Sequence, residues 1–322
     1  MAMTLTDMKV GMTDKVAQQV VDIFVRESEI LQVLPFDNCI SPEGGSTLTY
    51  SYLQTLQPST AAFRQLYGEY TASEAKQVRK TADLKIFGGK FSMDRVLKQA
   101  ESKYNNMAFQ MEQKILAAIG LFHYTMINGD ATTNPQEFDG LDKMLAGTTS
   151  EYNADGTIDI STMAKLKENA DQLYEALQNL IKATSANALL MNQAMISKIQ
   201  TMARILGYKT ESEEAFGRKI TTMDGIRFMD LKNVYAPGEG APVATPCVPI
   251  AGGLTDIYAV RFDVNDGFHG VTLTGSSGIT QYLPDFSQPG PVKDGEVEMV
   301  AATVLKNTAH AGVLRNIKLA GA

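Results

Sequence analysis

Apolar residues recur at helical spacing between residues 92 and 128, the longest periodic stretch in the chain. The shared face holds Leu97, Ala100, Tyr104, Met107, Met111, Ile115, Ala118 and Phe122. Their steps of three and four residues predict one helix. Ser92 or Asp94 is expected to start it, and Asn128–Gly129 is expected to end it with a left-handed cap. About 34 residues at about 1.5 Å each would make a rod on the order of 50 Å long.

A pattern of period two precedes this helix and predicts two strands. Residues 47–55 are rich in Thr, Tyr and Leu, and apolar residues alternate with polar ones from Val78 to Ile86, where Lys80 interrupts the apolar row. About twenty largely polar residues join the strands, a length typical of functional or disordered loops. A two-stranded ribbon is marginally stable alone in water. We therefore expect this chain or a neighbouring copy to cover its apolar edge.

The rest of the chain alternates between expected helices and strands. Helices are expected from Thr13 or Asp14 to Pro35, over 141–145, from Ser161 to about Lys182, and from Asn192 to Gly207. Residues 153–160 are expected to turn into a strand, and further strands are expected at 186–192, 225–231, 255–263, 270–274, 278–283 and 296–319, the last interrupted near 307–310. Residues 236–253, rich in Pro and Gly, are expected to be a loop.

Composition narrows the class of protein. Of 322 residues, 44% are hydrophobic and 20% are charged, the balance of a folded globular protein. The net charge of −7 argues against a dedicated nucleic-acid binder, although one local face remains available for DNA. Cys39 and Cys247 form no CxxC pattern, which indicates a reducing compartment without a disulfide framework. The N-terminus lacks a signal-peptide pattern, and no apolar run suggests a membrane span.

Residues that suggest chemistry are few. His123, His269 and His310 are widely separated, and none has a second His or Cys at the spacing of metal ligands, so we interpret them as structural. Residues 151–162 match a calcium loop, except that Thr162 stands where a bidentate Glu belongs. We interpret this stretch as a turn with its own side-chain hydrogen bonds.

Two glycine-containing stretches imitate catalytic motifs without their spacing. FGGKF at 87–91 lacks the first glycine and the Ser or Thr of a phosphate loop, and we interpret it as a turn between strand and helix. GSSG at 275–278 does not match a nucleophile elbow and is interpreted as a surface turn. The sequence thus predicts no catalytic residue, no cofactor and no metal, and the protein is expected not to be an enzyme.

The order of the elements, rather than any single motif, carries a resemblance. First comes an N-terminal arm helix, then GGS and a long ribbon, and then a long helix that ends in NGD. EFDGL follows that helix, a buried LLMN strand leads into a capped helix, and a β-strand closes the chain. Over essentially the whole chain this order resembles the tailed-phage major capsid protein, the Hong Kong 97 type of fold. The resemblance implies an α+β fold with an N-terminal arm, an extended β-hairpin loop, a long spine helix, and peripheral and axial domains.

The resemblance also implies a division of the chain. The parts are the N-terminal arm at 1–40, the extended loop at 41–92, the spine helix and start of the peripheral domain at 93–149, a mainly axial domain at 150–295, and the C-terminal strand of the peripheral domain at 296–322. Gly129 is expected to make a sharp turn and Gly140 a tight backbone approach. The long charged scaffolding segment of larger members does not precede the arm, so either the scaffold is a separate protein or a prodomain is missing from this sequence.

The function that the resemblance implies is structural. Many copies would assemble as hexamers and pentamers into the icosahedral head shell of a tailed double-stranded DNA bacteriophage, inside the host cytoplasm, without a membrane. A portal, a scaffolding protein, a maturation protease and non-specifically contacted DNA are the implied partners. An encapsulin-like shell around cargo enzymes is the alternative, and an unrecognised α+β enzyme is a third hypothesis.

Charge placement, independently of the resemblance, singles out one surface. Basic residues outnumber the single acid Asp83 within 75–90, and the candidate inter-subunit contacts among them are Arg79, Lys80, Lys85 and Lys90. They are either a solvated strand edge kept basic against aggregation or a surface that docks on an acidic patch of an adjacent copy. ESEE at 211–214 and KDGEVE at 293–298 are the candidate acidic partners.

Overall fold

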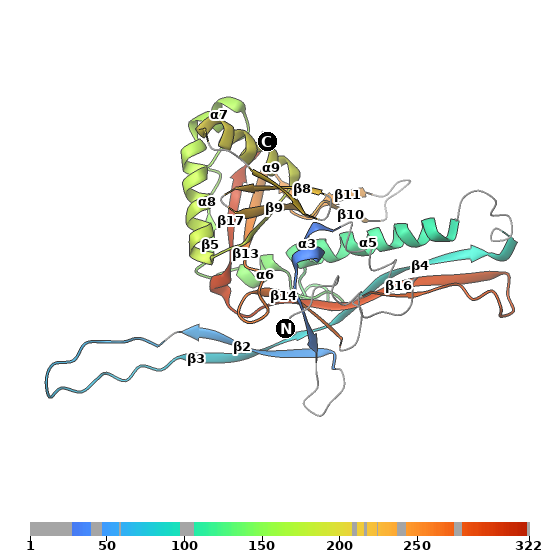
Figure 1. Ribbon diagram of the computed structural model, residues 1–322, viewed down its shortest axis with the longest axis horizontal. Coiled ribbons are helices and arrows are strands. Elements are labelled where there is room, and N and C mark those ends of the chain that lie inside the picture. The colour runs from blue at the N-terminus through green and yellow to red at the C-terminus, as the bar shows by residue number, and fades with distance from the viewer. Residues whose placement is uncertain are drawn as a thin grey trace.

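Two main sheets organise the molecule (Figure 1). The computed structural model describes residues 28–39, 47–57, 59–96, 106–207, 211–215, 218–223, 225–236, 243–273 and 279–320. Around the smaller sheet lies what we call the lower body, which also contains α5 (Asn106–Asn128) and α6 (Leu141–Leu145). Around the larger sheet lies the upper body, which also contains α7 (Met163–Glu168), α8 (Ala170–Thr184) and α9 (Gln193–Leu206).

The lower body is built on a five-stranded sheet centred on one long strand. Its members are β1 (Phe36–Cys39), β14 (Phe268–Leu273), β16 (Val292–Leu305), β15 (Ile279–Tyr282) and β4 (Lys85–Asp94). β16 pairs antiparallel with β4 from Val292 opposite Asp94 to Ala301 opposite Lys85. β1, which follows the short helix α3 (Glu29–Val33), pairs in parallel with β14.

The upper body is built on an eight-stranded sheet. Its order is β5 (Glu151–Asn153), β17 (Ala311–Lys318), β13 (Leu254–Val260), β6 (Ala188–Met191), β9 (Ile226–Asp230), β8 (Arg218–Met223) and β7 (Glu211–Ala215), with β12 (Ile250–Ala251) pairing with β13. β16 and β17 are consecutive along the chain, separated by the 3-10 turn Thr308–His310, yet they belong to different sheets. The chain therefore crosses between the bodies at this turn.

Alternate residues of the eight-stranded sheet enter two different cores. Leu189 and Met191 of β6 pack with α8 and α9, whereas Leu190 packs with α5, α6 and the lower sheet. β13 alternates in the same way, with Ile257 on the first side and Tyr258 on the second. Period-two side-chain alternation thus joins the bodies through a shared apolar core.

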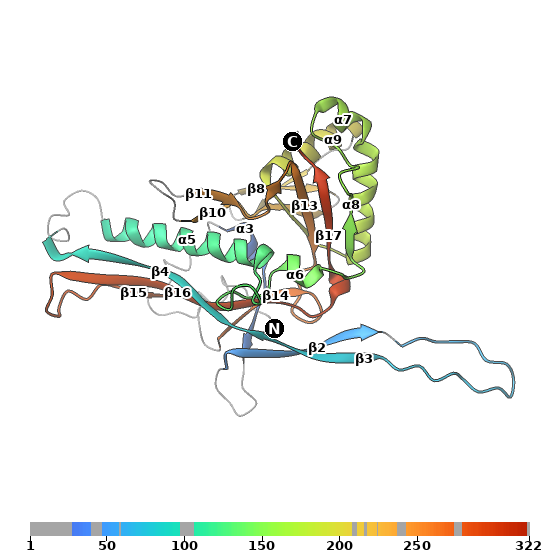
Figure 2. The same cartoon turned by 180° about the vertical axis from the view of Figure 1, so that it is seen from behind.

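The predicted buried face of the spine helix is confirmed where the structure describes it. α5 lies along β4 and β16 (Figure 2), and Met111, Ile115, Ala118 and Phe122 are buried. Its 23 residues span about 35 Å. Ser92 does not start a helix, because it lies inside β4. Asp94 is the last residue of β4, and its Oδ1 accepts a hydrogen bond from the amide of Val96, where helical residues begin. Residues 97–105, with three positions of the predicted face, lie outside the described residues.

The end of α5 is set by two glycines that meet across a tight loop. The helix ends at Asn128 as predicted, but Gly129 does not adopt the left-handed conformation expected of it. A Cβ on Gly129 would lie 2.2 Å from the carbonyl oxygen of Phe138, and one on Gly140 would lie 2.4 Å from that of Ile127. The amide of Gly140 donates to the Gly129 carbonyl at 2.8 Å. The predicted approach at Gly140 is confirmed, and Gly129 is needed for closeness rather than for its φ angle.

FGGKF is not a turn between strand and helix, as the sequence suggested, but the middle of β4. A Cβ on Gly88 would lie 1.9 Å from the carbonyl oxygen of Val297 on β16, and one on Gly89 would lie 2.9 Å from Cδ of Lys114 on α5. The glycines therefore allow a neighbouring strand and the spine helix to approach the backbone of β4.

Other boundaries were predicted correctly or shifted slightly. The buried strand β6, the cap of α9 by Asn192, its end at left-handed Gly207 and the break at residues 307–310 are confirmed. Thr162, not Ser161, caps α7, and Asn169 separates α7 from α8. Residues 153–160 turn at left-handed Asp155 and Gly156. Asn153, before the turn, belongs to β5, and after the turn Asp159 forms only an isolated β-bridge with Lys318 in place of the predicted strand.

Two further predictions meet a different outcome. Residues 236–253 are not simply a loop, because β10 (Asn233–Ala236) and β11 (Val243–Pro246) form a hairpin there. Of the helix predicted at 13–35, the described part is only α3, which Ser28 caps, so the proposed caps Thr13 and Asp14 lie outside the described residues.

Candidate assembly surface

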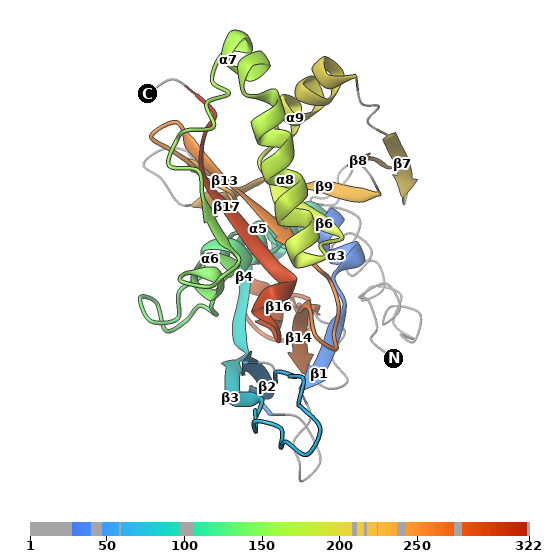
Figure 3. The same ribbon diagram turned by 90° about the vertical axis from the view of Figure 1, so that its left-hand side faces the viewer.

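A two-stranded ribbon projects from the molecule away from both bodies (Figures 1 and 3). It consists of β2 (Thr49–Gln57) and β3 (Lys76–Asp83), which pair antiparallel from Thr49 opposite Asp83 to Gln57 opposite Lys76. The predicted ribbon is therefore confirmed. β3 is exposed along nearly its whole length.

The tip of the ribbon, residues 59–75, presents large apolar side chains to solvent. Phe63 and Tyr67 are fully exposed, at 107% and 96%, and Leu66 and Tyr70 are also exposed. The guanidinium of Arg64 lies 5.3 Å from the centre of the Tyr70 ring. Ser73 Oγ accepts hydrogen bonds from the amide of Thr60 at 2.7 Å and from its hydroxyl at 2.9 Å, which ties the two sides together. Exposed apolar patches of this kind mark interaction sites.

The root of the ribbon is fixed to the lower body by specific contacts. The Tyr50 hydroxyl donates to Oδ2 of Asp37 on β1 at 2.6 Å. Buried Gln54 donates from Nε2 to the carbonyl of Leu305, at the end of β16, at 3.3 Å. A small apolar cluster, Cys39, Leu84, Val271 and Val304, lies beneath Tyr50 and Tyr52. The direction of the ribbon is therefore set by the fold, while its tip is left uncovered.

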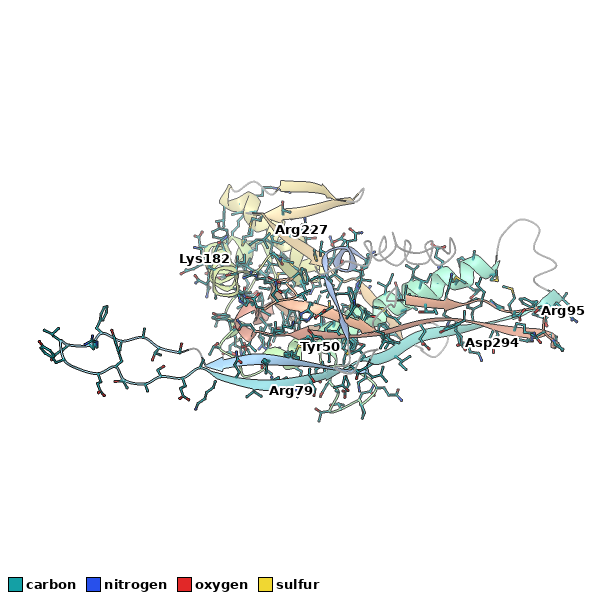
Figure 4. All side chains as sticks on the ribbon, turned by 60° about the horizontal axis from the view of Figure 1, so that its bottom comes forward. Tyr50, Arg79, Arg95, Lys182, Arg227 and Asp294 are labelled. Carbon is teal, nitrogen blue, oxygen red and sulfur yellow. The ribbon has the colours of Figure 1, made fainter. Side chains whose placement is uncertain are left out.

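The four basic residues singled out in the sequence do not form one cluster. Arg79 lies on the exposed ribbon and donates to Ser51 Oγ at 3.1 Å (Figure 4). Lys80 and Lys85 line a recess of about 780 Å³ between the root of the ribbon and the α6 region, where Lys143 contacts Asp130 and Asp139. Lys90 lies farther along β4, so Arg79 and Lys80 are the two of the four that lie on the ribbon itself.

The candidate acidic partners occupy different places. KDGEVE at 293–298 is part of β16, and its Asp294 forms an ion pair with Lys90 of the same chain, with 2.6 Å between Nζ and Oδ2. Asp294 lies on the opposite arm of the molecule from Arg79 (Figure 4). ESEE at 211–214 forms most of β7, an edge strand of the upper sheet. The two candidate acidic segments thus lie on different bodies, and one acid of the segment 293–298 is already paired within its own chain.

The two buried histidines are held in structural positions. Nε2 of His123 lies 2.7 Å from the Ser28 hydroxyl, and Nδ1 lies 3.0 Å from the carbonyl of Leu231. Desolvation lowers the pKa of His123 to about 4, despite the hydrogen bond to Leu231. Desolvation, followed by repulsion from Lys306, likewise lowers the pKa of His269 to about 4. Both imidazoles are therefore neutral in the folded protein near pH 7.

The lowered pKa values of His123 and His269 predict that the stability of the fold depends on pH. Because their pKa values are lower folded than unfolded, the unfolded chain binds more protons between about pH 6.5 and pH 4. The free energy of unfolding is thus expected to fall as pH decreases through this window, by up to about 1.4 kcal/mol per pH unit for each histidine. Urea titrations at several pH values measure this slope. A His123→Gln variant should show a shallower slope, and an unchanged one would contradict the assignment.

The remaining motifs are structural within the described residues. Oδ1 of Asp159 in the calcium-like stretch accepts from Ser161, and its pKa is lowered chiefly by the hydrogen bond from Lys165, so protein groups already engage this carboxylate. In the described part of the chain, no group of three or more His, Cys, Asp or Glu residues could hold a metal ion. None of the described helices is long and apolar enough to cross a membrane. GSSG at 275–278 lies outside the described residues.

Comparison with known proteins identifies the fold. No protein-family model and no curated protein matches the chain. Among solved structures, the SrpI encapsulin from Synechococcus elongatus matches with a TM-score of 0.58 at 13% identity, covering 96% of both chains. A Mycobacterium phage Bobi structure matches with a TM-score of 0.57 at 14% identity, covering 89% of this chain and 90% of that one. The capsid of a native GTA particle matches with a TM-score of 0.55 at 12% identity, covering 89% of each chain.

At such low identity these matches establish the fold alone. The chain has the mixed α and β capsid fold of the Hong Kong 97 type, extending over about nine tenths or more of its length. The resemblance found in the order of the sequence elements is confirmed at this level. The residues that sequence reasoning missed are the exposed side chains of the ribbon tip and the contacts of Tyr50 and Gln54 at its root.

Proposed function

We propose that this protein is the subunit of a closed shell assembled from many copies of itself. The observation that carries the proposal is a capsid-type fold that holds an uncovered two-stranded ribbon away from its body, with apolar side chains at the tip. An isolated ribbon is marginal in water, so a surface on a neighbouring copy is the natural cover. The contact is heterologous, joining the ribbon of one copy to a different surface of the next, and such contacts build rings and larger closed assemblies.

Within this class we propose the major capsid protein of a tailed double-stranded DNA bacteriophage. Hexamers and pentamers would form an icosahedral head in the host cytoplasm and enclose the genome through non-specific contacts. The ribbon is assigned as the extended loop, α5 as the spine helix, the lower body as the peripheral domain and the upper body as the axial domain. Compared with the division expected from the sequence, this assignment moves β14 and β15 from the axial segment 150–295 to the peripheral domain, and β17 from the C-terminal peripheral segment 296–322 to the axial domain. Portal, scaffolding protein and maturation protease are the proposed partners.

A second candidate is an encapsulin-like compartment that encloses cargo. It is favoured by one observation, the similarity to the SrpI encapsulin over 96% of both chains. Sedimentation velocity and negative-stain electron microscopy of the purified protein test whether it forms a shell at all. A soluble monomer under all assembly conditions would contradict both candidates, and packaged DNA or cargo protein would distinguish them.

The basic ribbon is proposed to dock on an acidic segment of the adjacent copy, with residues 211–214 and 293–298 as the candidates. Reversing Arg79 and Lys80 to Glu is expected to slow or abolish assembly without unfolding the subunit. Each surface pair contributes at most about 1 kcal/mol, but a shell repeats the contact many times, and salt screens it over about 10 Å. Light scattering at several salt concentrations measures the rate. Salt should slow assembly of the wild type and speed that of the variant.

The matched control reverses two exposed lysines away from the ribbon, Lys167→Glu and Lys182→Glu, which changes the net charge equally. It should assemble at nearly the wild-type rate. Normal assembly of the Arg79/Lys80 variant at low salt would mean that the basic ribbon is only solvated.

A further inference from the structure

One charged side chain connects the lower body to the upper sheet. Arg315, on β17, is only 17% exposed, and its guanidinium contacts carboxylates from three other elements. Nη1 donates to Oδ1 of Asp142 on α6 and, at 3.3 Å, to Oδ2 of Asp256 on β13, while Nε donates to Oε1 of Glu151 on β5. Nη2 also donates to the backbone carbonyl of Asp142 at 3.1 Å. A guanidinium is the side chain that can serve so many acceptors at once.

The surroundings of Arg315 hold it in place. The register between β13 and β17 shifts at Asp256, and opposite it Asn316 adopts a left-handed φ of 59°. Oδ1 of Asp256 accepts from the amide of Asn316 at 2.9 Å, which leaves Oδ2 for Arg315. Such β-bulges redirect side chains. The bulge therefore aims the third carboxylate at the guanidinium.

The carboxylates bound by Arg315 lie on both sides of a chain crossing. The chain leaves the lower body after α6 and enters the upper sheet at β5. Oε2 of Glu151 accepts from the amide of Gly147 in the connection at 2.7 Å, a bond that is the main cause of its lowered pKa. The Tyr258 hydroxyl adds a bond to Asp142 at 3.1 Å. Both ends of the crossing are thus tied to one residue.

α6 transmits this attachment to the rest of the lower body. The Gly140 amide that precedes it donates to Gly129 at the end of α5. The Thr303 hydroxyl of β16 donates to the carbonyl of Asp139 at 3.4 Å. The apolar core between the bodies is non-directional and leaves the position of α6 along the sheet weakly specified, whereas charged hydrogen bonds specify one register.

We propose that Arg315 is a positioning residue that fixes the orientation of α6, and with it the lower body, against the eight-stranded sheet. In the proposed shell this orientation sets the angle between the parts of each subunit, and hence the curvature at which copies meet. The first part of the inference concerns the single chain and does not rest on the proposed function. Only the consequence for particle size does.

The test is an Arg315→Lys variant, which keeps the charge but cannot reach all of these acceptors. Hydrogen exchange of the purified full-length protein, compared in the same assembly state, is expected to be about tenfold faster in α6 and residues 146–150, the factor for one lost charged hydrogen bond. Exchange in α8 should be unchanged. Asp142→Asn should accelerate exchange in α6 but not in β5. Arg261→Lys is the matched control, because Arg261 pairs locally with Asp263 at 3.5 Å.

The outcomes are distinguishable. Two results would overturn the proposal. If α6 of the Arg315→Lys variant exchanges at the wild-type rate, Arg315 has no positioning role. If exchange accelerates equally in α6 and α8, the substitution has only destabilised the protein in general. If the wild type assembles, the variant should give a broader distribution of particle diameters by electron microscopy than Arg261→Lys. If the wild type never assembles, the shell proposal fails while the exchange result still decides the role of Arg315.

Discussion

Deleting residues 59–74 is expected to leave a folded, helical subunit that forms no closed shell. The deleted segment is exposed, and the strands on either side of it end next to each other, at Gln57 and Lys76, so Pro58 and Ala75 can connect them. The root contacts of Tyr50 and Gln54 remain. Circular dichroism should show an unchanged helical signal, and sedimentation velocity should show monomers or capsomers in place of particles.

A second variant separates the length of the ribbon from its apolar tip. Replacing Phe63, Leu66, Tyr67 and Tyr70 by Ser keeps the loop and removes the exposed apolar surface. If the tip carries the contact, this variant should fail to assemble as the deletion does. Normal particles from the deletion variant would contradict the role of the ribbon tip.

Ile115→Asp is expected to give insoluble or unassembled protein. Ile115 is fully buried in the core between α5 and both sheets, so an aspartate there would place an unpaired charge among apolar side chains. The cost is about 4 kcal/mol or more, a large part of the about 5–15 kcal/mol that keeps a typical domain folded. Solubility after expression and urea denaturation of any soluble fraction measure it.

The control for this substitution lies on the same helix. Phe109 is 56% exposed, so Phe109→Asp changes the same helix without burying a charge. It should remain soluble and fold with nearly wild-type stability. Wild-type behaviour of Ile115→Asp would mean that the buried face of α5 is misassigned.

Elements with local signals could be predicted from the sequence. β6 is a short apolar run, Asn192 caps the helix that follows, and Gly207 ends that helix in the left-handed conformation. Each signal depends on a few neighbouring residues, so no knowledge of the tertiary fold was needed. The order of such elements was sufficient for the fold class.

Features that depend on distant segments could not be predicted. The glycines of FGGKF suggested a turn, but their purpose is the close approach of β16 and α5, which the local sequence does not contain. In the candidate site the ribbon itself was predictable from its period of two, whereas the Gln54–Leu305 bond at its root joins residues 251 positions apart. The ion pair of Lys90 with Asp294 is likewise a product of strand pairing.

The near-continuity of β3 and β4 gives the molecule a mechanical property. A single residue, buried Leu84, separates the two strands, and its amide is bonded to the carbonyl of Leu48 at 2.7 Å. The ribbon is therefore nearly continuous with β4, which pairs with β16 and packs against α5. A load applied at the tip first meets the root contacts of Tyr50 and Gln54, and Leu84 then passes the remaining load into β4 and the spine helix.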